Sequence, residues 1–94
     1  VDFTGELKRP TTVAEINEAY RKASEGPMKG VLGFSTAPLV SHDYNGCEQS
    51  STIDAELTTV LDGNFVKVVS WYDNESGFSA RMLDLTLLMA RKGI

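Results

Sequence analysis

The chain has 94 residues, of which 41% are hydrophobic and 23% charged, so it has room for one domain with a modest core. Its formal net charge of −4 argues against binding to nucleic acid or to an anionic membrane surface. No apolar run approaches the ~18 residues that a membrane-spanning helix needs. The single cysteine, Cys47, excludes an internal disulfide and is typical of the reducing cytoplasm.

The first residues predict a strand. Hydrophobic and polar side chains alternate over residues 1–7, and Pro10, which has no amide hydrogen to donate, ends the pattern. Because the pattern starts at Val1 with no turn or cap before it, we expect the chain to be cut from a larger protein.

A helix should follow from Thr12 to about Ser24. Thr12 and Glu15 have the spacing of a capping box, in which the threonine hydroxyl accepts the glutamate amide and the glutamate reaches back. Helical spacing predicts a buried stripe made of Val13, Ile16, Ala19, Tyr20 and Ala23. Gly26 and Pro27 then end the helix.

The middle of the chain predicts short strands separated by a loop. Runs of strand-forming residues occur at 31–34, 52–55 and 57–61. Between the first and second of these runs, residues 41–50 form a polar loop. After the last run, Asp62 and Gly63 predict a two-residue hairpin.

The strongest strand pattern lies at residues 65–72, where apolar side chains would occupy both faces. A helix should follow directly, from Glu75 or Ser76 to about Arg91. Its apolar stripe would comprise Phe78, Met82, Leu85, Leu88 and Met89.

Two amphipathic helices around four or five short strands predict a single α+β domain, a mostly antiparallel sheet with both helices packed on one face. The other face would need cover from a missing segment or from another subunit. We therefore expect a homo-oligomer, a dimer or tetramer that forms through the sheet face. The loop of residues 41–48, including Asp43 and Tyr44, would add polar contacts there.

The sequence predicts no catalytic or metal-binding role for Cys47 or His42. A catalytic thiol needs a base or a helix N-terminus that lowers its pKa, whereas Cys47 lies in a polar loop beside Glu48. One cysteine and one histidine fall short of the three or four ligands of a zinc site. The dispersed glycines form no phosphate-binding loop. We predict no catalytic and no metal-binding residue in this chain.

A polar elbow of Asp73, Asn74 and Glu75 joins the last strand to the last helix. An Asp or Asn at this position would cap the helix by accepting its free amides. An asparagine side chain can also match a ligand carboxamide, because it offers both a donor and an acceptor.

Residues 71–90, with the sequence WYDNESGFSARMLDLTLLMA, closely resemble the C-terminal signature of phosphorylating glyceraldehyde-3-phosphate dehydrogenase. The resemblance extends back through residues 23–33 and 40–45. It implies that residues 1–94 are a single domain, a C-terminal fragment of the catalytic domain, without the family's nucleotide-binding Rossmann domain and nucleophilic cysteine motif. It also implies a homotetramer whose catalytic domains pair through sheet faces.

The resemblance implies one cofactor-binding residue. Asn74 matches the asparagine that hydrogen-bonds the nicotinamide carboxamide of NAD in this family. Phe78 stands where the family commonly has tyrosine near the nicotinamide, so the ring is kept and a hydroxyl is lost. NAD, glyceraldehyde 3-phosphate and phosphate would bind in the intact parent, and the fragment alone should be inactive. The related erythrose-4-phosphate dehydrogenase and a stand-alone protein-interaction module are the alternative interpretations.

Overall fold

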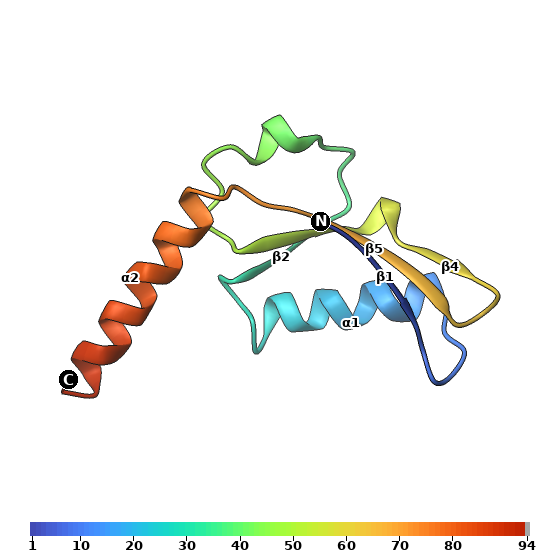
Figure 1. Cartoon of the computed structure of the whole chain (residues 1–94), viewed down its shortest axis with the longest axis horizontal. Coiled ribbons are helices and arrows are strands. Elements are labelled where there is room, and N and C mark those ends of the chain that lie inside the picture. The colour runs from blue at the N-terminus through green and yellow to red at the C-terminus, as the bar shows by residue number, and fades with distance from the viewer. Residues whose placement is uncertain (94) are drawn as a thin grey trace.

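The computed structural model describes residues 1–93. The chain is elongated, 49 × 30 × 19 Å, and its last helix extends away from the remainder (Figure 1). The elements follow in the order β1 (Asp2–Glu6), α1 (Val13–Glu25), β2 (Leu32–Ser35), η1 (Ser41–Tyr44), β3 (Ser51–Asp54), η2 (Ala55–Leu57), β4 (Thr59–Leu61), β5 (Phe65–Trp71) and α2 (Ser76–Arg91), where η marks a 3-10 helix.

Strand β5 organises the sheet. β1 pairs with it antiparallel along one edge, from Asp2 opposite Val69 to Glu6 opposite Phe65. β4 and β3 share the other edge, β4 at the start of β5 and β3 at its end, and both are antiparallel to it. β2 lies outside β3 and is parallel to it. The sheet is therefore mixed but mostly antiparallel, which confirms the predicted α+β class.

Helix α1 covers one face of this sheet, as predicted. Thr12 caps it, since the hydroxyl accepts the Glu15 amide at 3.1 Å. The Glu15 carboxylate accepts the Thr11 hydroxyl at 3.3 Å, which replaces the expected second half of the capping box. The core between helix and sheet comprises Leu32, Ile53 and Val68, with Ile16, Tyr20, Ala23 and Phe34 packed against them. Full burial of such a side chain stabilises the fold by about 1.5–3 kcal/mol.

The predicted hairpin is present, with a loop one residue longer than expected. Leu61 pairs with Phe65, so the connection consists of Asp62, Gly63 and Asn64. Asp62 and Gly63 have φ angles of 52° and 80°, the left-handed region that this dipeptide tolerates. The strand expected over residues 57–61 is shorter, because η2 occupies its first residue.

The sheet face opposite α1 is uncovered. Side chains alternate along β5, so that Val66 and Val68 are buried toward α1 while Phe65 and Lys67 point away and are exposed. Leu61, directly opposite Phe65, is 56% exposed, and Lys67 Nζ lies 3.1 Å from Asp2 Oδ2. This face thus combines an apolar end with an ion pair. A homo-oligomer that forms through it stays a prediction.

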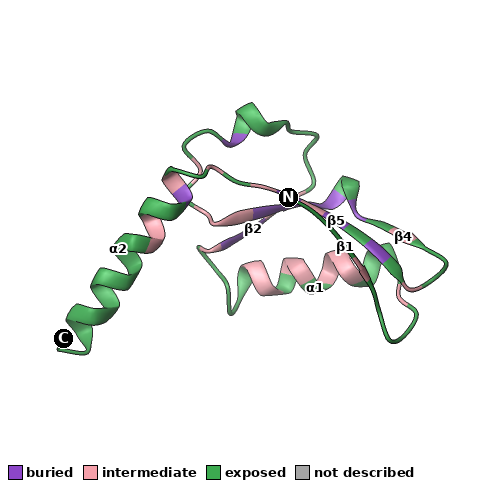
Figure 2. Cartoon of the chain, viewed as in Figure 1, coloured by how far each residue is buried: buried purple, intermediate pink, exposed green. Residues whose placement is uncertain are grey.

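The expectation that both helices pack on one face holds for α1 and is wrong for α2. Figure 2 shows α2 exposed along most of its length, and Gly77 is its buried residue. The predicted stripe therefore faces solvent together with Leu83 and Leu87. Apolar side chains lie on more than one side of this helix. The sequence pattern therefore predicts a helix but does not indicate which side of it would pack against the rest of the protein. Neither described helix is long and apolar enough to cross a membrane.

Candidate functional site

The elbow between β5 and α2 is held by one carboxylate. Asp73 Oδ1 accepts the amides of Glu75 and Ser76 at 2.8 and 2.9 Å, and Oδ2 accepts the amide of Gly46 at 2.8 Å. The amide of Gly77 also donates to the Asp73 carbonyl at 3.0 Å, which starts the helical bonding. These amides, that of Gly46 first, lower the pKa of Asp73 below its usual value, so the carboxylate is ionised at neutral pH. Asp73 caps α2, as predicted.

Trp71 anchors the end of β5 just before the elbow. Its indole Nε1 donates to Oδ2 of Asp54 at 3.0 Å, and Asp54 is only 3% exposed. The Tyr44 ring stacks on Trp71, with centroids 6.0 Å apart and planes at 9°. Tyr44 is buried within the chain, and its polar contact at an interface between subunits stays a prediction.

The first turns of α2 pack closely on the segment before β3. A Cβ on Gly77 would lie 2.9 Å from the carbonyl oxygen of Gln49, a distance that real Cβ atoms essentially never show. Arg81 Nη1 donates to the Ser50 hydroxyl at 3.0 Å. These contacts fix where the helix begins and in which direction it leaves the domain.

Asn74 lies at the tip of the elbow and is exposed. Two hollows adjoin it, one of about 450 Å³ shared with His42 and Asn45 and one of about 270 Å³ shared with Phe78. Phe78 is 66% exposed, so an apolar ring and a carboxamide border the second hollow together. This combination can hold a flat aromatic ligand that carries an amide.

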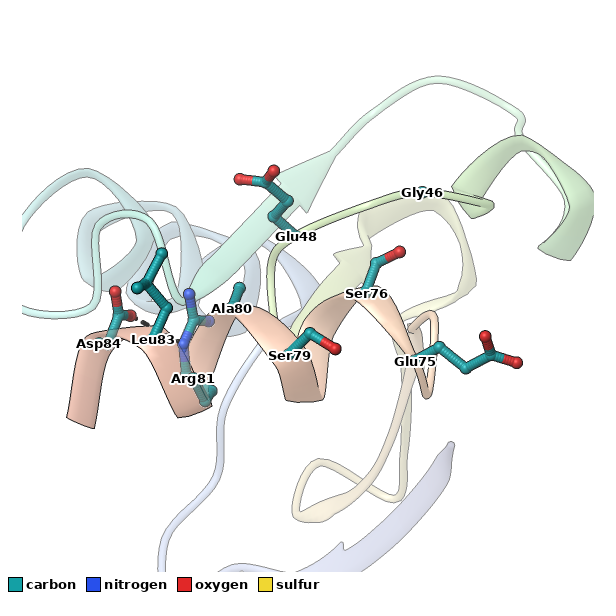
Figure 3. Close-up of a pocket in the computed structure, with 9 residues that line it drawn as sticks. All are labelled: Gly46, Glu48, Glu75, Ser76, Ser79, Ala80, Arg81, Leu83 and Asp84. Carbon is teal, nitrogen blue, oxygen red and sulfur yellow. Dashed lines mark hydrogen bonds and ion pairs between the residues drawn. The ribbon is translucent and has the colours of Figure 1, made fainter. Parts of the chain in front are cut away.

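A third hollow, of about 540 Å³, lies along another side of α2 (Figure 3). Its lining includes Glu48, Ser76, Ser79 and Arg81, but not Asn74. Arg81 Nε donates to Asp84 Oδ2 at 2.9 Å, the pair marked by a dashed line in Figure 3. The Arg81 guanidinium already bonds Asp84 and Ser50, so its role here is structural. It is therefore less available to bind an anionic ligand in this hollow.

His42 lies in η1, a 3-10 helix that occupies the start of the segment expected to be a polar loop, and Cys47 lies in the loop that follows it. The His42 Nδ1 atom is 3.2 Å from the Asn45 side-chain nitrogen. Cys47 Sγ lies 3.7 Å from the Gln49 side-chain oxygen, and neither contact supplies a base to the thiol. Over residues 1–93, no three His, Cys, Asp or Glu side chains lie close enough together to hold a metal ion.

Several residues that build the elbow were not identified from the sequence. The Asp54–Trp71 bond joins positions in separate strands, and the stack on Tyr44 joins the 3-10 helix η1 to a strand. The Asp73–Gly46 bond spans 27 positions. Gly77 did carry a local signal, because glycine in the first turn of a helix often marks close backbone approach.

The sequence of this folded region shows which class of protein the chain belongs to. The sequence model of the family described as glyceraldehyde 3-phosphate dehydrogenase, C-terminal domain, matches residues 1–74. The match covers most of the chain, so the chain belongs to this family. The matched residues end at Asn74 and include all five strands and α1.

Similar proteins align along the whole chain. It is 56% identical to glyceraldehyde-3-phosphate dehydrogenase 1 of Bacillus cereus and 54% identical to that of Bacillus subtilis strain 168. It is 55% identical to the glyceraldehyde-3-phosphate dehydrogenase of Geobacillus stearothermophilus. Each alignment covers 100% of this chain and 28% of the relative. The chain therefore spans little more than a quarter of the length of these relatives.

Proposed function

We propose that this chain forms the C-terminal part of the catalytic domain of an NAD-dependent, phosphorylating glyceraldehyde-3-phosphate dehydrogenase of glycolysis. The observation that carries this proposal is the full-length alignment of the chain with enzymes of that name. In the parent enzyme, glyceraldehyde 3-phosphate would be oxidised through a cysteine thiohemiacetal and the resulting thioester attacked by phosphate. Those reacting groups would come from the part of the enzyme outside this chain.

Asn74 is the residue that we assign to the cofactor in this proposal. Its exposed carboxamide can donate to and accept from the nicotinamide carboxamide, and the Phe78 ring borders the same hollow. Phe78 offers no hydroxyl, so its contribution would be packing against the nicotinamide ring.

The charge of the elbow supports the nicotinamide end of NAD over its phosphates. Asp73 is held ionised by three backbone amides, and Glu75 follows Asn74 directly. The oxidised nicotinamide ring is a cation, which such carboxylates attract, whereas they repel a pyrophosphate. The Rossmann domain of the parent would hold the remainder of the dinucleotide.

Isolated, the 94-residue chain should be inactive and bind NAD very weakly. One asparagine offers hydrogen bonds worth only about 0.5–1.5 kcal/mol each. Calorimetric titration of the chain with NAD should show no micromolar affinity, and such an affinity would contradict the proposal that the main binding surface lies elsewhere.

We also propose that the chain self-associates through the uncovered sheet face and that the parent functions in the cytoplasm. The exposed side chains of Phe65 and Leu61 support self-association. The single unpaired cysteine supports a cytoplasmic parent. Light scattering at micromolar concentration should give a mass of two or four chains. A mass near one chain, 10.3 kDa, would contradict the interface.

The assignment of Asn74 can be tested in the longer enzyme that carries this chain. Asn74→Ala should raise the KM for NAD about tenfold, the effect of losing a donor and an acceptor together. Asn64→Ala is a matched control. Asn64 lies in the hairpin between β4 and β5, far from the elbow, and its side-chain nitrogen donates to the Leu7 carbonyl. An unchanged KM and kcat in Asn74→Ala would count against the assignment.

A further inference from the structure

The Asp73 carboxylate does more than cap a helix. Its Oδ1 atom alone accepts the two amides at the start of α2, those of Glu75 and Ser76. Its Oδ2 atom binds the amide of Gly46, in the loop that precedes β3, at 2.8 Å. The cap would be complete without this second contact, so the Gly46 bond is a tertiary contact between loop and elbow.

We propose that Asp73 is a positioning residue for NAD, which holds the Asn74 carboxamide in the orientation that the nicotinamide requires. This inference rests on the proposed contact between Asn74 and NAD. Asp73 itself would not touch the cofactor. It would act by fixing the backbone on both sides of its neighbour.

The bonds around Asn74 restrain the two peptides that flank it. The Glu75 amide belongs to the peptide that follows Asn74, so its bond to Asp73 sets the plane of that peptide. On the other side, the carbonyl of the peptide that precedes Asn74, that of Asp73, accepts the Gly77 amide at 3.0 Å. The Asp73 side chain is also tied to Gly46, and the Trp71 side chain to the buried Asp54. The backbone that carries the Asn74 side chain is therefore fixed to the sheet, the loop and the helix.

A fixed backbone matters because the Asn74 side chain is exposed, so burial does not hold it in one orientation. A ligand that binds a mobile group must also order it, and an elbow arranged during folding removes part of that cost. Loss of the Asp73 contacts should therefore weaken recognition of the nicotinamide carboxamide, even in a protein that is fully folded.

The test compares NAD with its 3-acetylpyridine analogue, in which a methyl group replaces the carboxamide nitrogen. In the longer enzyme, Asp73→Ala should reduce the preference for NAD, measured as the ratio of kcat/KM values, about three- to tenfold. Asp73→Asn should fall between Ala and wild type, because one amide oxygen must serve three donors. Thr12→Ala, which removes the cap of α1, should lower the melting temperature and leave the preference unchanged.

The double variant of Asp73→Ala with Asn74→Ala should have the same preference for NAD as Asn74→Ala alone, since Asp73 acts through Asn74. Wild-type preference in both Asp73→Ala and Asp73→Asn, with the preference lost in Asn74→Ala, would overturn the positioning role. Wild-type preference in Asn74→Ala itself would instead overturn the cofactor contact on which this inference rests. Asp73→Asn keeps the test decisive if Asp73→Ala does not fold.

Discussion

Replacement of Gly77 by alanine tests how tightly α2 is joined to the domain. The added Cβ would lie 2.9 Å from the Gln49 carbonyl oxygen and 3.6 Å from the Ser50 Cα atom. Because both are backbone atoms, either the helix or the segment before β3 must shift, and overpacking of this kind costs about 1–3 kcal/mol. Alanine gains at most about 1 kcal/mol of helix propensity over glycine, and less in the first turn. The clash should prevail, with a net loss of about 1 kcal/mol.

Thermal unfolding of the chain, followed by circular dichroism, measures this loss. For a domain of this size, a loss of about 1 kcal/mol lowers the melting temperature by about 4–8 °C. Ser79→Ala is the matched control, since Ser79 is an exposed residue of the same helix and gains propensity without a clash. If Gly77→Ala melted at or above the temperature of Ser79→Ala, the close packing of α2 on Gln49 would be refuted.

Two further predictions concern the supports of the elbow. Trp71→Phe keeps a ring for the Tyr44 stack but leaves the buried Asp54 Oδ2 atom without its donor. This change should lower the free energy of unfolding by about 1–3 kcal/mol. A denaturation midpoint equal to that of wild type would argue against this bond. The pKa of Asp73 is lower in the folded chain than in the unfolded chain, so its contribution to stability is present above its unfolded pKa and is lost as the pH falls through the folded value. The melting-temperature difference between wild type and Asp73→Ala should therefore shrink from about pH 6 to about pH 3, and a constant difference would contradict the role of the charge.

The local signals of the sequence predicted most of the fold. The Thr12 cap and the Asp62-Gly63 hairpin lie where short-range patterns indicate them. Ile16, Tyr20 and Ala23 of the predicted α1 stripe pack on the core, whereas its other two members, Val13 and Ala19, are exposed. Each depends on hydrogen bonding or spacing within a few residues, which sequence displays directly. The capping role of Asp73 was predicted for the same reason.

The contacts that shape the candidate site depend on long-range neighbours. Periodicity gives no partner for an exposed helix such as α2, and no local rule pairs Asp73 with Gly46 or Trp71 with Asp54. The family resemblance indicated Asn74 by its place in the Trp-Tyr-Asp-Asn-Glu block, but not the bonds that fix its backbone. Those bonds form only when the loop before β3 and the end of β5 come together.

The most direct test of this account is a crystal structure of the longer enzyme with NAD bound. The account predicts that the Asn74 side-chain oxygen and nitrogen lie within about 2.7–3.2 Å of the nicotinamide carboxamide, with the Asp73 bonds to Gly46 and Glu75 intact. A carboxamide bonded elsewhere, with Asn74 out of hydrogen-bonding distance, would contradict it.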